Sequence, residues 1–160
     1  MTATIVATRL IDGHSYRIDT DPDRLDIALI HDFLASQSHW ARGITRDVLC
    51  RAIANSMVFG LYRGDVQIGF ARVVTDRATF AYLADVFVIA GSRNAGIGQW
   101  LIETILAHPE MQGLRRWLLV TARAESLYRR CGFADLQSRL CYLERFDAAA
   151  YAGTGEAAPV

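Results

Sequence analysis

The residues whose types and spacing suggest chemistry gather around a glycine-rich loop at positions 91–98. An apolar stretch, 86–90, leads into this loop. The spacing of Ile97, Trp100 and Leu101 predicts a helix after it, with one buried face. A glycine-rich turn that opens a helix leaves backbone N–H groups unpaired at the positive end of the helix dipole. Such a terminus attracts phosphate, so we expect a cradle for a pyrophosphate group.

Three kinds of phosphate-binding loop compete for this stretch. A nucleoside-triphosphate loop needs Lys and then Ser or Thr after its last glycine, but Ile97 and Gly98 follow Gly96. A dinucleotide loop needs G-x-G-x-x-G, but Leu101 stands where the third glycine belongs. What remains is an R-x-x-G-x-G pattern between a predicted strand and a predicted helix. Its residues are Arg93, Asn94, Ala95, Gly96, Ile97 and Gly98.

This pattern resembles the acetyl-CoA loop of the GCN5-related N-acetyltransferase (GNAT) family, which reads Gln or Arg, two residues, Gly, one residue, then Gly or Ala. About 30 residues further on, the stretch 124–133 resembles a second segment of the family, A-x-x-L-Y-x-x-x-G-F. The two segments stand in the order that the family has. The resemblance covers roughly 16–143, and 114–119 is similar to a bacterial subgroup of undefined substrate.

The resemblance implies that acetyl-CoA binds at the loop. Gly96 and Gly98 would let the backbone approach the pyrophosphate without a Cβ in the way. The backbone of Val86 and Val88 would pair with the pantetheine arm like an added strand, while their side chains join the core. Arg93 either contacts a phosphate oxygen or is a solvated loop residue. The predicted cofactor-binding residues are Val86, Val88, Arg93, Asn94, Ala95, Gly96, Ile97 and Gly98.

Two residues are candidates for catalysis. The resemblance implies direct attack of an amine on the thioester, and the phenol of Tyr128 could donate a proton to the leaving sulfur. The alternative is that Tyr128 is a core residue of its helix. Asp85, between apolar neighbours on the strand before the loop, could accept the proton of the amine directly or through water. The alternative for Asp85 is a structural hydrogen bond.

The acceptor is predicted to lie against His39, Trp40 and Tyr82. His39 and Trp40 fall in a break between two predicted helices that would border the acceptor site, and Tyr82 lies on the strand before the loop. The chain departs from the family at Asn94, where relatives often have Gly, and at 121–125. The second departure puts the identity of the acceptor in doubt more than the cofactor. Activity itself is an open question, and a non-catalytic acyl-CoA binding or sensing module is the alternative.

Composition limits the class of protein. The chain has 160 residues, 52% hydrophobic and 21% charged, as in soluble globular domains. Acidic and basic residues number 17 each, which argues against nucleic acid or an anionic membrane as the main partner. No signal peptide or membrane span is evident, so we expect a cytoplasmic protein. The family resemblance allows a homodimer, for which no interface can be read from the sequence.

The three cysteines show no metal-ligand spacing, and we expect no metal and three buried thiols. They are Cys50, Cys131 and Cys141.

The expected fold is α/β (α+β), with a mixed, mostly antiparallel twisted sheet and helices on both faces. We expect one domain, 1–146, whose first dozen residues are loose, and a disordered tail, 147–160. Helices are predicted from Pro22, from Thr45 and over 97–107, and a short one over 124–131. Strands are predicted over 14–19, 57–62, 66–75, 78–89, 114–121 and 133–146.

Overall fold

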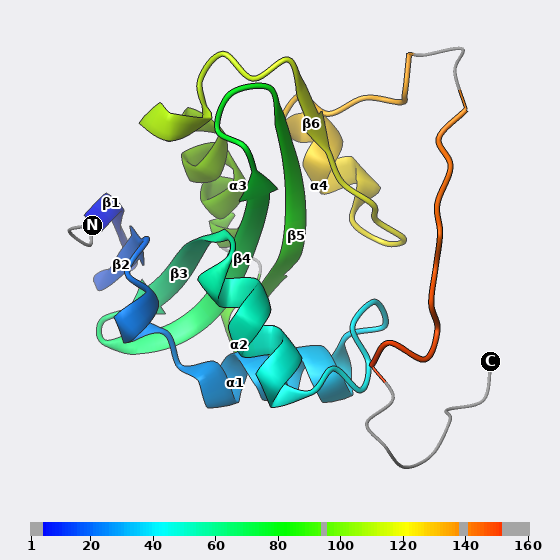
Figure 1. The fold of residues 1–160 in the computed structure, drawn as a ribbon. Coiled ribbons are helices and arrows are strands. Elements are labelled where there is room, and N and C mark those ends of the chain that lie inside the picture. Colours follow the sequence, from blue (N-terminus) through cyan, green and yellow to red (C-terminus); the bar gives the residue numbers. More distant parts are fainter. Residues whose placement is uncertain (1–4, 94–95, 138–140, 152–160) are drawn as a thin grey trace.

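The structure, a computed structural model, describes residues 5–93, 96–137 and 141–151. Six strands form a single sheet (Figure 1). They are β1 (Ile5–Ile11), β2 (His14–Asp19), β3 (Met57–Arg63), β4 (Val66–Thr75), β5 (Phe80–Val88) and β6 (Arg116–Leu118). The α-helices are α1 (Ile27–Asp32), α2 (Arg46–Ala54), α3 (Ile97–Ala107) and α4 (Glu125–Arg130).

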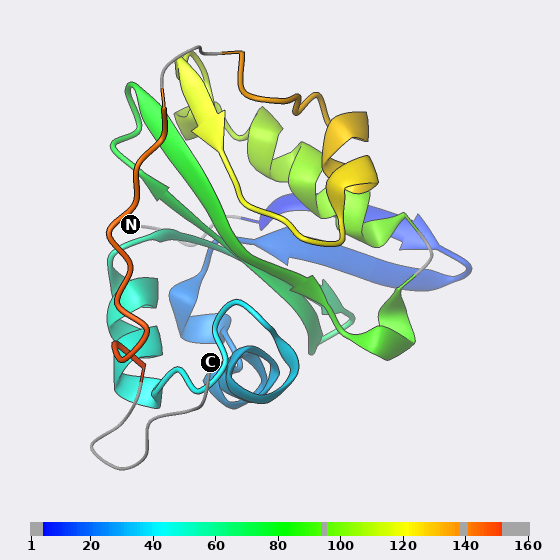
Figure 2. The same ribbon diagram turned by 90° about the vertical axis from the view of Figure 1, so that its right-hand side faces the viewer.

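The sheet is mixed and mostly antiparallel, as predicted. Its strands lie in sequence order, each antiparallel to the last from β1 to β5, and β6 then pairs with β5 in parallel. The parallel step requires a crossover, which α3 provides. The helices cover both faces: α1 and α2 lie on one side and α3 and α4 on the other (Figure 2). The predicted fold class is therefore confirmed.

Two separate hydrophobic cores lie on the two faces of the sheet. The first, called the α3-side core, includes Phe59, Leu61, Leu101 and Ile105, all fully buried. The second, called the α1-side core, includes Leu34, Leu49, Phe70 and Phe87. Side chains of one strand alternate between the two faces, so β3 and β4 supply both cores.

The helical region before β3 differs in part from its prediction. Thr45 caps α2 as expected, because its hydroxyl accepts the Val48 N–H at 3.4 Å. The predicted helix from Pro22 is divided in two. Asp21 caps a single 3₁₀ turn, Pro22–Arg24, and the chain is then extended at Leu25 before Asp26 caps α1. The side chain of Gln67 accepts the Asp26 N–H at 2.6 Å, which ties the break to the sheet.

Further predictions are wrong near the two ends and at the cysteines. Residues 5–11, expected to be loose, form strand β1, because the hairpin turn at Asp12 and Gly13 lets them pair with β2. The last strand, expected over 133–146, is not formed in the described parts 133–137 and 141–146. The strand predicted over 114–121 is shortened to Arg116–Leu118. Cys50 and Cys141 are exposed and Cys131 is half-buried.

A β-bulge at Asp85 interrupts the pairing of β4 with β5. The register runs from Arg72–Ala84 to Phe70–Phe87, so β5 has one residue more than β4 in this interval. Asp85 itself has φ +54°, in the left-handed region that Asp tolerates better than most side chains. Because of the extra residue, the positions of β5 that face the α3-side core change from odd-numbered to even-numbered residues. Ala81 and Leu83 face the α3-side core before the bulge, and Val86 and Val88 face it after.

Beyond the bulge, β4 and β5 approach too closely for a side chain at Gly69. A Cβ built at Gly69 would lie 2.7 Å from the Phe87 carbonyl oxygen, a main-chain atom that cannot move aside cheaply. We therefore expect Gly69→Ala to lower the free energy of unfolding by about 1–3 kcal/mol, measured by urea denaturation. Gly91→Ala is the matched control, because a Cβ there meets no atom within 4 Å. Equal stability of the two variants would contradict the close approach.

Candidate active site

The site begins at an edge of β5 that β6 leaves open. The two strands pair at only three positions, the last being Tyr82 with Leu118. The Ile89 N–H donates to the Ile68 carbonyl of β4, and alternation along the strand then turns the main-chain groups of Val86 and Val88 away from β4. These groups, predicted to pair with pantetheine, thus face an edge on which no strand pairs in the described part of the chain.

The N-terminus of α3 lies beside this edge. Gly96 has φ +69° and precedes the first helical residue, Ile97, whose side chain is buried in the α3-side core. Among the described residues no side chain caps this end of α3, so its first N–H groups are available to a ligand. A Cβ at Gly98 would lie 3.9 Å from Val88 and 4.0 Å from Leu127, so the first turn of α3 lies between β5 and α4. Asn94 and Ala95, also predicted to bind the cofactor, lie outside the described residues.

Arg93 was predicted either to contact a phosphate oxygen or to be solvated, and in the structure its side chain bonds to the main chain of β5. Its Nε donates to the Val88 carbonyl oxygen at 2.9 Å, across the turn that joins β5 to the loop. The side chain is exposed, and its remaining guanidinium N–H groups are directed away from this bond. Arg93 is therefore tethered at the mouth of the loop, between the open edge of β5 and the start of α3.

Tyr128 reaches the same region from α4. Its ring packs against the α3-side core and makes an edge-on contact with Phe133, with ring centroids 5.9 Å apart. Burial, and to a lesser extent the nearby Cys131 thiol, raises the pKa of the Tyr128 phenol to about 12. The phenol is therefore protonated at neutral pH, which is the state that a proton donor needs.

Asp85 lies on the opposite face of the sheet, and its surroundings are more polar than predicted. Arg72 Nε donates to one carboxylate oxygen, Oδ2, at 2.8 Å, and the Trp40 indole N–H donates to the other, Oδ1, at 3.2 Å. The Asp85 side chain is only 8% exposed and the Arg72 side chain 17%. Removing one partner of such a buried pair costs about 3–5 kcal/mol, because it leaves a buried charge without a counter-charge.

The structure brings two of the three predicted acceptor residues together with Asp85. Trp40 bonds to Asp85, and its ring makes an edge contact with His39 at 5.1 Å between ring centroids. Tyr82, half-buried, lies on β5 before the bulge, on the face opposite Ala81 and Leu83. Two of the predicted acceptor residues, His39 and Trp40, thus group around Asp85, and Tyr82 makes no hydrogen bond to any of the three.

Sequence reasoning missed three side chains of this group. Arg72 lies in the middle of a predicted strand, and its Nη1 donates to Ser56 Oγ at 3.0 Å. Phe33 stacks on Phe87 at 3.9 Å between ring centroids and also contacts the Trp40 ring. A charged residue inside an otherwise apolar strand was the available signal for Arg72, since a buried charge needs a partner.

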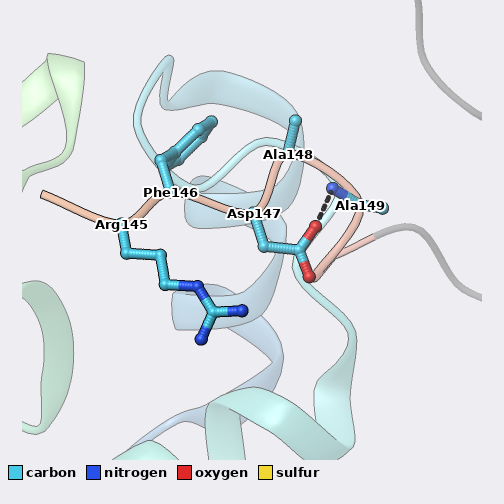
Figure 3. Close-up of a pocket in the computed structure, with 5 residues that line it drawn as sticks. All are labelled: Arg145, Phe146, Asp147, Ala148 and Ala149. Carbon is cyan, nitrogen blue, oxygen red and sulfur yellow. Dashed lines mark hydrogen bonds between the residues drawn. The ribbon is translucent and has the colours of Figure 1, made fainter.

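A hollow of about 630 Å³ lies elsewhere, along the turn Arg145–Ala149 near the described end of the chain (Figure 3). In this turn the Asp147 carboxylate accepts the Ala149 N–H at 2.9 Å. Five consecutive residues line the hollow, and none of them belongs to the predicted site. The open edge of β5 therefore gives the better account of a binding site.

Comparison with known proteins agrees with this geometry. The model of the acetyltransferase (GNAT) domain matches residues 54–135, just over half of the chain. A candidate acetyltransferase of Gibberella zeae is 31% identical over 135 residues, which cover 71% of this chain and 75% of that protein. The protein therefore belongs to the GNAT acetyltransferase family, as the loop and the segment around Tyr128 predicted.

Solved structures show the same fold. A candidate GNAT-family acetyltransferase from Xanthomonas campestris pv. campestris is 40% identical, with a TM-score of 0.82 over 86% of this chain and 97% of that one. A predicted acetyltransferase from Clostridium acetobutylicum, solved with acetyl-CoA, has a TM-score of 0.59 at 16% identity. That alignment covers 82% of this chain and 96% of the other. The second likeness bears on the fold alone.

The described residues contain neither a candidate metal site nor a candidate membrane-spanning helix. No cluster of three or more His, Cys, Asp or Glu side chains suited to a metal ion occurs in 5–93, 96–137 and 141–151. Within the same ranges, no helix combines the length and the apolar character that crossing a membrane requires.

The two glycines of the loop should respond differently to substitution. Gly96→Ala places a Cβ in the left-handed region, so we expect a loss of about 1–2 kcal/mol in unfolding free energy and weaker acetyl-CoA binding. Gly98→Ala should retain the stability, because its Cβ makes ordinary contacts with Val88 and Leu127, but should weaken acetyl-CoA binding, because the Cβ would stand where the backbone approaches the pyrophosphate. Urea denaturation and calorimetric titration with acetyl-CoA measure the two effects. A similar loss of stability in both variants, or unchanged acetyl-CoA affinity in Gly98→Ala, would contradict these roles.

Proposed function

We propose that the protein is an acetyl-CoA-dependent N-acetyltransferase that moves the acetyl group to a primary amine by direct attack in a ternary complex. The observation that carries this proposal is the open edge of β5 beside the start of α3. A protonated phenol lies on the α3 side of the sheet and a carboxylate on the other. The solved relative that holds acetyl-CoA has the same fold, which is consistent with this cofactor.

The residues suit such a cofactor at three points. The N–H groups of the first turn of α3, reached past Gly96, would hold the pyrophosphate. The main-chain groups of Val86 and the N–H of Val88 would pair with the pantetheine amides, as in strand addition, while the Val88 carbonyl keeps its bond from Arg93. Arg93, which lies between these two places, would turn its other guanidinium N–H groups toward a phosphate oxygen. Bound there, acetyl-CoA supplies an activated acetyl thioester.

Asp85 and Tyr128 would then handle the protons and the developing charge. The amine nitrogen forms a bond to the acetyl carbon and gives its proton to Asp85, directly or through water, while the carbon–sulfur bond breaks. Tyr128 donates a hydrogen bond to the sulfur, which leaves as a thiolate. Because a thiol of ordinary pKa near 8.5 is a stronger acid than a phenol at about 12, Tyr128 stabilises the thiolate without fully giving up its proton.

Most of the rate would come from holding the amine and the thioester together. Well-oriented reactants gain roughly 7–11 kcal/mol over the bimolecular reaction. Acid–base help adds about 10²–10⁴-fold. Loss of Tyr128 should therefore slow turnover without abolishing it.

A second candidate function is a non-catalytic acyl-CoA binding module. It is favoured by one observation: both oxygens of Asp85 already accept hydrogen bonds, one of them from a guanidinium. With both oxygens occupied, the carboxylate has to give up one of these hydrogen bonds before it can accept a proton from an amine. Thiol release from acetyl-CoA with a broad panel of amines decides between the two functions. Repeated turnover on any amine excludes the second, and tight binding without turnover across the panel excludes the first.

Tyr128→Phe is expected to lower kcat by about 10²-fold and to leave the affinity for acetyl-CoA unchanged, because it removes only the hydroxyl. Thiol release and calorimetric titration measure the two quantities. Phe133→Leu is the matched control, since it changes the ring beside Tyr128 and keeps the phenol. Unchanged turnover in Tyr128→Phe would remove Tyr128 from the mechanism.

The pH dependence follows from the raised pKa of Tyr128. The phenol is the proton-donating form and stays protonated below its pKa of about 12, so its loss cannot slow the reaction in the neutral range. We therefore expect the pH profile of kcat to have the same shape in the wild type and in Tyr128→Phe up to about pH 10. A decrease in kcat between about pH 7 and 9 that occurs in the wild type and is absent in Tyr128→Phe would contradict the raised pKa of the phenol.

A further inference from the structure

The two oxygens of the Asp85 carboxylate have unlike partners. Oδ2 accepts from the Arg72 guanidinium at 2.8 Å, a distance typical of a charge-assisted hydrogen bond. Oδ1 accepts from the neutral indole of Trp40 at 3.2 Å, the long end of the usual range. The bond at Oδ2 is therefore the strong one, and the bond at Oδ1 is the one that a better donor can replace.

Arg72 is fixed at both ends of its guanidinium. While Nε donates to Asp85, Nη1 donates to Ser56 Oγ at 3.0 Å, and that hydroxyl donates to the Ala52 carbonyl near the end of α2 at 2.6 Å. A planar guanidinium anchored in this way sets both the position and the plane of the carboxylate it binds. Asp85 needs this support, because its backbone is in the left-handed region.

Trp40, in contrast, is held weakly. It lies between the helical turn Phe33–Gln37 and α2, and 46% of its surface is exposed. Its aromatic contacts are the edge contact with His39 and a tilted one with Phe33, at 6.4 Å between ring centroids. An indole N–H at so exposed a ring can be solvated when its bond to Asp85 breaks, so the cost of moving it is small.

We propose that Oδ1 of Asp85 is the docking point of the acceptor amine, whose N–H takes the place of the Trp40 indole N–H. The displaced ring then lies against the body of the acceptor, which assigns the acceptor to primary amines carried on a flat, uncharged, apolar group. Arg72 is the positioning residue that holds Asp85 for this exchange.

This inference rests on the proposed function, because it describes the acceptor half of the same reaction. Its test uses binding without chemistry, so that the two can fail separately. The protein is saturated with coenzyme A, which carries no acetyl group, and titrated with 2-phenylethylamine while tryptophan fluorescence is followed. The control is Trp40→Phe, which keeps an aromatic ring but has no indole N–H. Any fluorescence change that remains in this variant comes from Trp100 and Trp117.

We expect a saturable change in fluorescence that Trp40→Phe loses. Asp85→Asn and the alcohol 2-phenylethanol should each weaken binding by about 10–100-fold, the value of a hydrogen bond to a charged group. The absence of saturable binding by the amine, or equal affinities for amine and alcohol, would overturn the inference. In either case, turnover on other amines would leave the proposed function standing.

The positioning role of Arg72 is tested by kinetic constants that a loss of stability alone would not change selectively. Arg72→Gln should lower kcat/KM for the amine by at least about 10-fold with KM for acetyl-CoA unchanged, and Arg72→Lys should restore part of it. Arg17→Gln is the matched control, because Arg17 forms a similarly buried ion pair with Asp19 at 3.2 Å on the distant strand β2. An equal loss of kcat/KM in Arg17→Gln and Arg72→Gln, or no rescue by Lys, would overturn the positioning role.

Discussion

The extra residue at Asp85 is the constraint on which the site depends. If Asp85 were paired as an ordinary strand residue, the alternation of β5 would turn Val86 and Val88 to the α1 side of the sheet and Phe87 to the α3 side. With the bulge, Phe87 completes the stack with Phe33 in one core, while Val86 and Val88 join the other. One inserted residue thus packs both cores and places a carboxylate beside the open edge of the strand.

A bulge of this kind persists only where its surroundings hold it. Asp85 is held from three elements: β4 through Arg72, the loop before α2 through Trp40, and the end of α2 through Ser56, which binds Arg72. The close approach at Gly69 belongs to the same arrangement, because it brings the Phe87 carbonyl within reach of β4 on the far side of the bulge. The backbone strain is therefore offset by ion pairing and packing that act only in the native fold.

Local patterns predicted the parts of the molecule that local physics decides. The meander of β3, β4 and β5, the cap at Thr45, and the turn from β5 through the glycine loop into α3 follow from alternation, capping and glycine positions. The resemblance at 93–98 and 124–133 supplied the family. The bulge was not predictable in this way, since its cause is the fit between two strands and no residue in β5 marks it.

The other errors share that origin. Asp85 was expected among apolar neighbours, and its true partners, Arg72 and Trp40, are 13 and 45 positions away in the sequence. Strand β1 is an exception, because its β-branched residues and the Asp12–Gly13 turn are local signals of a hairpin that the prediction overlooked. The stretch 133–146 shows the reverse: its composition favours a strand, yet its described parts do not pair.

The separation of the two cores by the sheet has a consequence for how such proteins diverge. The family model begins at Ala54, the last residue of α2, and ends just after α4, so it spans the half of the molecule that would handle acetyl-CoA. Helix α1, the loop with Trp40 and nearly all of α2 lie outside it. Since these elements pack on their own core, mutations there can accumulate without disturbing the packing around α3. Lineages can in this way acquire new acceptors while inheriting an unchanged acyl-donor half.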